Sequence, residues 1–344
     1  MPPKPSAKAE AWILFDQIVA DAAPGGRHTN PWGRSLEGQL SFEPDYATLE
    51  RLLGVPLHLK AGTQSGVPAL ALDVWLSYEF RRAGFSRDQV WPRPQHPRIL
   101  PAAVSALIKG LPQALGQQVA SRIERSSSIP DVTSSSAAIL GKNYLKQVDV
   151  IMTDWATGPE LLVSTKRMDS SYGKNAPNRV EESYGDAKNL RLRHPLAALG
   201  FVFGLRSDIL QKEPKTADWL FDLLVKLGQE DDAYHATGLI LMDYADEAAL
   251  PDSASEPQDA DGILEPGPEP VPDDEDAAAT IPEAAVDAII RRLPKVRIVT
   301  ERTPPELSPG RFLAAMVTRV LAATPVNMHE EARSRRAEGF AGQE

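Results

Sequence analysis

The sequence contains no cysteine among its 344 residues. It therefore can form no disulfide and offers no thiolate as a nucleophile or metal ligand. Its six histidines, at positions 28, 58, 96, 194, 235 and 329, are never three to five residues apart, so a local zinc clamp is not expected. Phosphate-loop, dinucleotide-turn, hydrolase-elbow and zinc-protease motifs are also absent. ATPases, dinucleotide enzymes, α/β-hydrolases and typical zinc proteases are therefore not the leading candidates.

Long apolar runs are absent too. No run approaches the roughly 20 residues that a membrane-spanning helix needs. The first residues, MPPKPSAKAE, hold no apolar signal-peptide segment. Hydrophobic residues still make up 42% of the chain, enough for a substantial core. We therefore expect a soluble cytoplasmic protein with no membrane partner.

The net charge of −10 is concentrated in one place. The segment from Asp252 to Asp276 holds ten acids and no Lys or Arg, so the rest of the chain is neutral overall. Its composition predicts that residues 251–282 form a disordered acidic linker. Leu161–Arg193, by contrast, contains seven basic and four acidic residues. That balance favours phosphate binding, although it also suits a solvated helix face with ordinary ion pairs.

The periodicity predicts an α/β fold. Apolar runs at 198–205 and 237–244 suit buried strands, and a helix with core-facing leucines is expected between them. We expect a mixed central sheet flanked by helices, with a largely helical N-terminal region. The expected regions are the N-terminal region (1–110), the core (111–250), the linker (251–282) and C-terminal helices that pack on the core (283–344).

Two strand-like segments, Gln147–Thr153 and Glu160–Arg167, are joined by a polar turn and are expected to form a β-hairpin. Side chains alternate between the faces of a strand, so this hairpin can bring Asp149 near Ser164 and Lys166. A carboxylate beside a lysine can hold a divalent cation and a water against a phosphodiester. Asp149 and Lys166 would also suit a structural ion pair in an ordinary hairpin.

This order of elements resembles the core of the PD-(D/E)XK nuclease superfamily, which includes many restriction endonucleases. The resemblance covers residues 117–210: a polar helix, the strand KQVDV (146–150), the strand LLVSTK (161–166) and a basic helix (178–193). It implies that Asp149 takes the place of the family's strand aspartate and Lys166 that of its lysine. It also implies Mg²⁺ as cofactor and double-stranded DNA as partner, with assembly as a homodimer left open.

One position departs from the family motif, because Ser164 stands where the family usually has an acid. Glu160 shares the face of Ser164, but four residues of strand place it roughly 13 Å away, too far to share a metal. The resemblance therefore implies that a helix supplies the missing carboxylate. The candidates are Glu181 or Glu182 after the hairpin and Glu124 before it.

The sequence thus predicts a Mg²⁺-dependent DNA endonuclease of the restriction or phage-defence type. Asp149 and the Thr165 carbonyl would bind the metal, and Lys166 would orient the attacking water. Glu124 or Glu182 would complete the oxygen shell, and residues 1–110 would help to grip DNA. The residues expected to contact phosphates are Lys174, Arg179, Lys188 and Arg193.

Two other interpretations stay open. One is a nuclease fold that has lost its metal, as Ser164 suggests, and serves as a DNA-binding or protein-binding component of a defence complex. The other is an interaction protein organised by the acidic linker.

Overall fold

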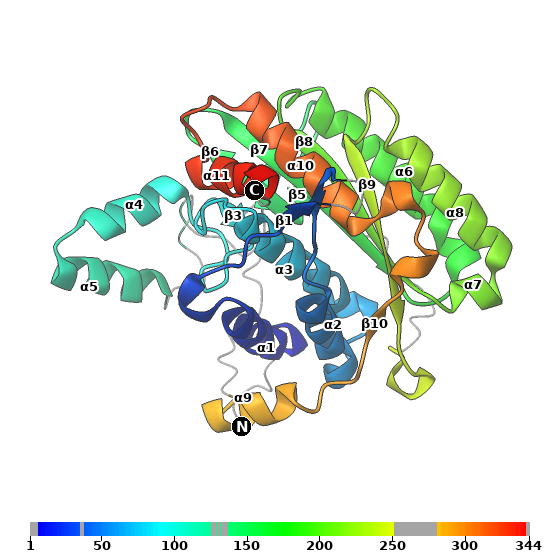
Figure 1. Cartoon of the computed structure of the whole chain (residues 1–344). Coiled ribbons are helices and arrows are strands. Elements are labelled where there is room, and N and C mark those ends of the chain that lie inside the picture. Colours follow the sequence, from blue (N-terminus) through cyan, green and yellow to red (C-terminus); the bar gives the residue numbers. More distant parts are fainter. Residues whose placement is uncertain are drawn as a thin grey trace.

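The structure, a computed structural model, describes residues 6–34, 38–124, 129, 132, 137–250 and 281–341. Its centre is a six-stranded mixed sheet with the strand order β10-β9-β8-β7-β6-β3 (Figure 1). Strands β7, β8 and β9 are parallel, whereas β6, β3 and β10 run antiparallel to their neighbours. The expected mixed central sheet is confirmed. In sheet order the strands span Arg297–Ile298, Ala236–Asp243, Ala198–Arg206, Gly158–Met168, Val150–Asp154 and Val90–Trp91.

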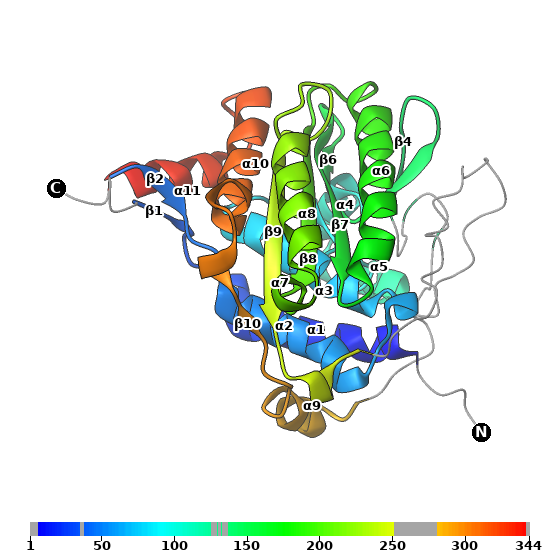
Figure 2. The ribbon, with the colours of Figure 1, turned by 90° about the vertical axis from the view of Figure 1, so that its right-hand side faces the viewer.

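Helices cover both faces of this sheet (Figure 2). The first face carries α3 and α10, with α1 and α2 packed against α3, and the second face carries α6 and α8. All nine residues of β8 are buried, because a central strand covered on both sides must be apolar throughout. The six helices span Ala7–Ala22 (α1), Tyr46–Leu59 (α2), Val67–Arg82 (α3), Tyr172–Arg191 (α6), Pro214–Leu227 (α8) and Pro309–Ala323 (α10).

Smaller elements surround this core. A two-stranded sheet of β1 and β2 packs against α10 and α11, and β4 pairs with β5 in another small sheet. Helices α4 and α5 project from one side of the molecule (Figure 1). These elements span Trp32–Arg34 (β1), Leu40–Phe42 (β2), Ala102–Gly110 (α4), Gln113–Glu124 (α5), Ala137–Leu140 (β4), Leu145–Val148 (β5), Ile209–Lys212 (α7), Glu283–Ile290 (α9) and Glu330–Ala341 (α11).

Two element boundaries differ from the sequence-based expectation. The single strand expected over Gln147–Thr153 is divided at Asp149, because β5 pairs with β4 while β6 pairs with β7. The basic helix expected from residue 178 begins six residues earlier, at Tyr172. Pro177 lies inside this helix, where its ring removes one backbone donor without ending the helix.

The N-terminal region contributes directly to the sheet layers. Helix α3 packs on β7, and β3 is the edge strand beside β6. Residues of the N-terminal region (1–110) therefore supply both a covering helix and an edge strand of the central sheet. At the other end, α10 packs on β8 and β9, so the C-terminal helices belong to the same layers.

Two further expectations concern the linker and the membrane. Residues 251–280 of the expected acidic linker lie outside the described residues. Within the described ranges, no helix combines the length and the apolar character needed to cross a bilayer.

Candidate active site

The chain changes strand partners at Asp149. Strand β6 pairs with β7 from Val150 onward, opposite Val163, and Asp149 lies one residue earlier, at the bend after β5. Its Oδ2 accepts the backbone N–H of Thr165 at 2.7 Å. The hairpin expected from the sequence is therefore present. Asp149 lies at the open end of this hairpin and contacts Thr165, which stands between Ser164 and Lys166.

A second acid reaches the same place from α3. Asp73 lies in the middle of this helix with only 7% of its surface exposed, and its Oδ1 accepts the Thr165 hydroxyl at 2.6 Å. Thr165 thus donates to both acids, through its backbone N–H to Asp149 and through its side chain to Asp73. The packing of α3 on β7 therefore gathers two carboxylates around one strand residue.

The two carboxylates repel each other. Burial raises the pKa of Asp73 well above its ordinary value, and the charge of Asp149 raises that pKa further. The Thr165 hydroxyl and the charges of Lys8 and Lys166 act in the opposite direction. A cation held between the acids would relieve this repulsion.

The donor set fits a partly hydrated Mg²⁺. Carboxylate oxygens are hard ligands, and Mg²⁺ commonly uses one or two protein carboxylates while it keeps several waters. Among the residues that the structure describes, no group of three or more His, Cys, Asp or Glu side chains could hold a metal ion. A cation at this place would have Asp73 and Asp149, the two acids that share Thr165, as its carboxylate ligands, with water in the remaining positions.

Ser164 points away from Asp73. Successive residues of a strand face opposite sides, so Thr165 faces α3 and Ser164 faces α6. Ser164 is 6% exposed and lies near the buried Tyr234, whose hydroxyl donates to the Ser183 carbonyl of α6 at 3.0 Å. Ser164 is thus part of the packing between the sheet and α6.

Of the glutamates expected to replace the missing acid, Glu182 forms an ion pair, and Glu181 and Glu124 are exposed. Glu182 pairs with Arg179 on α6, with Oε2 3.2 Å from the guanidinium, and Glu181 is exposed. Glu124 ends α5 and lines a small hollow beside Lys109. The acid that shares Thr165 with Asp149 comes instead from α3, which lies outside the region of family resemblance.

Glu160 has partners at the other end of β7. Its Oε2 lies 2.9 Å from Nε2 of His329, and both side chains are buried. The Thr157 hydroxyl donates to Oε1 of Glu160 at 2.6 Å. Glu160 therefore ties the hairpin turn to the start of α11.

The four basic residues expected to contact phosphates follow the length of α6. Lys174 is exposed near its start, and Arg193 is exposed just beyond its end. Lys188 forms an ion pair with Asp232 at 3.1 Å, and Arg179 is the half-buried partner of Glu182. Of the four, Lys174 and Arg193 are the most accessible to a nucleic acid.

Asp73 is the functional candidate that the sequence analysis missed. The signal was a charged residue inside the apolar stretch ALALDVWL (69–76), on a helix whose residues are almost all buried. A buried acid requires partners, because an unpaired charge is costly inside a protein. Only the packing of α3 on β7 reveals that Thr165 and Asp149 surround it.

Comparisons with known proteins assign the chain to no group. The chain matches no family model, no curated protein and no solved structure. Its function is therefore inferred from the geometry around Thr165.

Proposed function

We propose that the protein is a metal-dependent deoxyribonuclease with a site related to that of the PD-(D/E)XK nucleases. The observation that carries the proposal is the position of Thr165, which donates to both Asp73 and Asp149. Lys166 follows directly in the chain, and its charge acts on Asp73. Two acids and a lysine are the groups that metal-assisted phosphodiester hydrolysis needs.

The order of elements around the site supports the same proposal. Strands β6 and β7 form an antiparallel hairpin, and β8 runs parallel to β7 after the crossover helix α6. The hairpin followed by a helix is part of the order of elements on which the family resemblance rests. Asp73 differs from that motif, because it comes from α3 rather than from the position of Ser164.

Each residue has a defined role in this proposal. Asp73 and Asp149 would hold Mg²⁺. Lys166, which strand alternation places on the Ser164 face of β7 opposite Thr165, would orient the attacking water from that face. Thr165 positions both carboxylates through its two donors. When bound, the ion would polarise the phosphoryl oxygens and lower the pKa of a bound water. Restriction of foreign or phage DNA is the setting that the resemblance suggests.

A second candidate function rests on Ser164. The acid of the family motif is missing at this position, so the fold can also be interpreted as a DNA-binding or protein-binding component without catalysis. In that case Asp73, Asp149 and Thr165 form a structural cluster. The two candidates differ in one measurable property, since only the nuclease requires a divalent cation at the site.

The test compares cleavage and cation binding in the same proteins. Wild-type protein is incubated with supercoiled and linear double-stranded DNA, with Mg²⁺ and with a chelator, and Mg²⁺ binding is measured by calorimetry. We expect cleavage only with Mg²⁺, and we expect Asp149→Asn and Asp73→Asn each to lower both cleavage and cation affinity at least tenfold. Lys166→Ala should lose cleavage while it keeps Mg²⁺ binding, because the lysine acts on the water.

Asp222→Asn is the matched control. Asp222 is an exposed acid on α8 that pairs with Lys226, so the same chemical change there should leave cleavage and cation binding intact. Cation binding without cleavage of any DNA would contradict the proposal that the protein is a nuclease. Wild-type protein that neither binds Mg²⁺ nor cuts DNA would favour the second candidate.

A further inference from the structure

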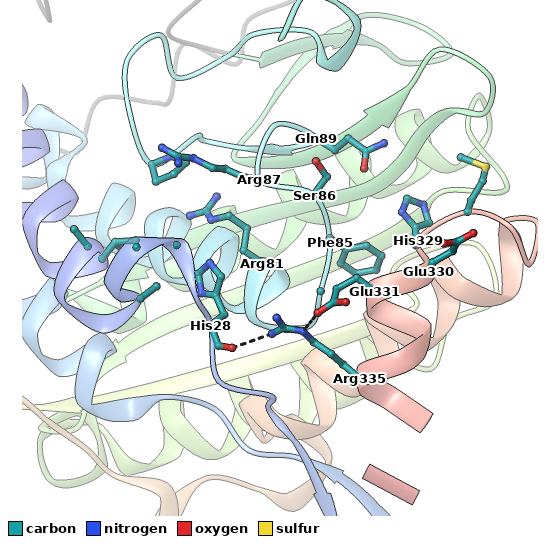
Figure 3. Close-up of a pocket in the computed structure, with 18 of the residues that line it drawn as sticks. His28, Arg81, Phe85, Ser86, Arg87, Gln89, His329, Glu330, Glu331 and Arg335 are labelled. Atoms are coloured by element: carbon teal, nitrogen blue, oxygen red, sulfur yellow. Dashed lines mark hydrogen bonds and ion pairs between the residues drawn. The ribbon is translucent and has the colours of Figure 1, made fainter. Parts of the chain in front are cut away.

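A large cavity lies apart from Asp73 and Asp149, between α1, the end of α3 and the start of α11 (Figure 3). Its volume is about 820 Å³, which is within the range of sites that bind drug-sized molecules. The apolar part of its wall includes Val19, Ala23, Phe85 and Met328. The cavity is therefore able to hold the hydrophobic body of a small molecule.

Arg81 provides an unusual cation in the wall of this cavity. It is 3% exposed, and its guanidinium donates to the Pro92 carbonyl at 3.1 Å and to the Ser77 hydroxyl at 3.2 Å. Its Nε has no hydrogen-bond partner in the described part of the protein. Burial, more than any neighbouring charge, lowers the pKa of Arg81 to about 9, so the guanidinium remains charged at neutral pH.

The other buried arginines show what Arg81 lacks. Each of them has a carboxylate within ion-pair distance, whereas among the described residues Arg81 has none. Asp16, which also lines the cavity, is the negative charge that acts most on Arg81, but both of its oxygens accept hydrogen bonds from Arg98, at 2.8 and 3.0 Å. A buried cation without a counter-charge is costly. The five paired arginines are Arg82, Arg93, Arg98, Arg167 and Arg206.

The remaining polar groups divide the cavity into two ends. His28, Arg81 and Arg87 lie at one end, and His329, Glu330 and Glu331 lie at the other (Figure 3). Nδ1 of His28 is buried without a hydrogen-bond partner in the described ranges. Burial lowers the pKa of this histidine to about 4, so its ring is neutral at pH 7 and can donate or accept one hydrogen bond.

We propose that this cavity is a binding site for a small organic monoanion, whose single carboxylate or sulfonate pairs with Arg81 and whose aromatic body lies against the apolar wall. One negative charge matches Arg81, the one buried guanidinium that has no carboxylate within ion-pair distance among the described residues. At the opposite end Glu331 is paired with Arg335, and the charge of Glu330 disfavours a ligand with further negative charges. This binding site does not depend on the proposed nuclease activity.

The probe is anilinonaphthalene sulfonate, a fluorescent aromatic monoanion, and its comparison is N-phenylnaphthylamine, which has the same rings and no charge. Titrations of the full chain follow the fluorescence of each probe. In Arg81→Gln we expect the affinity for the sulfonate to fall about tenfold or more, because a charged hydrogen bond is lost. The affinity for the neutral probe should change less than twofold, and Arg81→Lys should retain most of the sulfonate binding.

Two other variants make the test independent of the folding of Arg81→Gln. Ala20 is an exposed residue of the cavity wall, so Ala20→Trp should fill the cavity and abolish binding of both probes without disturbing the core. Arg51→Gln is the control for loss of an arginine elsewhere, since Arg51 is an exposed partner of Asp21. It should bind both probes like the wild type, and thermal melting should show that each variant tested is folded.

Competition then identifies the ligand class. Naphthylacetate, a monoanion, should displace the sulfonate probe, and adenosine monophosphate, which carries more charge, should displace it at least tenfold less effectively. If adenosine monophosphate displaced the probe more effectively than naphthylacetate, the proposal of a ligand with a single negative charge would be contradicted. Unchanged sulfonate affinity in Arg81→Gln, or probe binding that persists in Ala20→Trp, would overturn the proposal.

Discussion

Thr165 shows how much one residue can determine in this protein. Most residues of β7 are buried, and by strand propensity alone a valine would fit the strand as well as threonine. Only the hydroxyl, however, reaches Asp73 while the backbone N–H reaches Asp149. Because each acid keeps a donor from Thr165, the two carboxyl groups can stay close together in a buried place, where burial and the charge of Asp149 raise the pKa of Asp73.

Glu79 is a second buried acid on α3, with a structural role. It is fully buried, and it accepts the Asp45 N–H at 2.6 Å and the Arg82 guanidinium at 2.7 Å. Burial raises its pKa from 4.5 to about 7, although Arg82 and the Asp45 N–H oppose that shift. In the folded protein Glu79 therefore holds its proton over a range where the unfolded chain has lost it.

This shift predicts how the free energy of unfolding depends on pH. Between pH 4.5 and 7 the folded state binds more protons at Glu79 than the unfolded state does, so stability falls as pH rises through this window. The contribution is at most about 3 kcal/mol. Urea unfolding at a series of pH values should show a flatter dependence for Glu79→Gln than for the wild type. Parallel curves for the two proteins would show that the pKa of Glu79 is not raised.

At the scale of elements, local sequence patterns predicted the strands and the hairpin. The position of Asp73 beside Thr165 depends instead on long-range packing. The runs at 198–205 and 237–244 are β8 and β9, because a continuous apolar stretch of this length is typical of a strand covered on both faces. Asp149 and Lys166 could be found because strand alternation is a local property. Asp73 could not, because it is 92 residues from Thr165 in sequence and meets it only through the packing of α3 on β7.

Close packing between α10 and the sheet depends on a glycine of β8. A Cβ added at Gly200 would lie 2.8 Å from ring atoms of Phe312 and 2.9 Å from Cε of Met316. Gly200→Ala should therefore lower the free energy of unfolding by about 1–3 kcal/mol, because the buried rings have little room to move. Denaturant titration measures this loss.

Gly185→Ala is the matched substitution for this test. Gly185 is exposed on α6, and a Cβ there would meet nothing within 4 Å. Alanine should raise the free energy of unfolding by about 0.5–1 kcal/mol, because glycine is a poor helix former. Equal effects of the two substitutions would mean that the contact between α10 and β8 is looser than the structure shows.

At the scale of the whole molecule, the two proposed sites share one helix. Asp73 and Arg81 both belong to α3, and eight residues of helix separate them by about 12 Å along its axis. The helix packs on β7 near Asp73 and ends at the cavity near Arg81. Each site can nevertheless be tested alone, since Mg²⁺ is the probe of one and an aromatic sulfonate the probe of the other.

The whole-molecule charge predicts a further property of DNA binding. The chain carries a net charge of −10, so any attraction to DNA must come from a local basic surface. Lys174 and Arg193 are exposed at opposite ends of α6, whereas Lys188 is paired with Asp232. If α6 lies along the phosphates, reversing the two exposed charges should flatten the dependence of log affinity on log salt by about two units, one for each lost contact.

The measurement is a fluorescence-anisotropy titration of Lys174→Glu/Arg193→Glu with duplex DNA at several salt concentrations. Arg292→Glu/Arg311→Glu changes the net charge by the same amount at two exposed residues, at the end of α9 and the start of α10. This control separates a specific contact of α6 from the effect of net charge, because a general effect would flatten the slope equally in both double variants. A slope that changes only in the α6 variant places phosphates beside α6, the helix that follows the Asp149–Lys166 hairpin, whereas an unchanged slope would exclude this face as the DNA-binding surface.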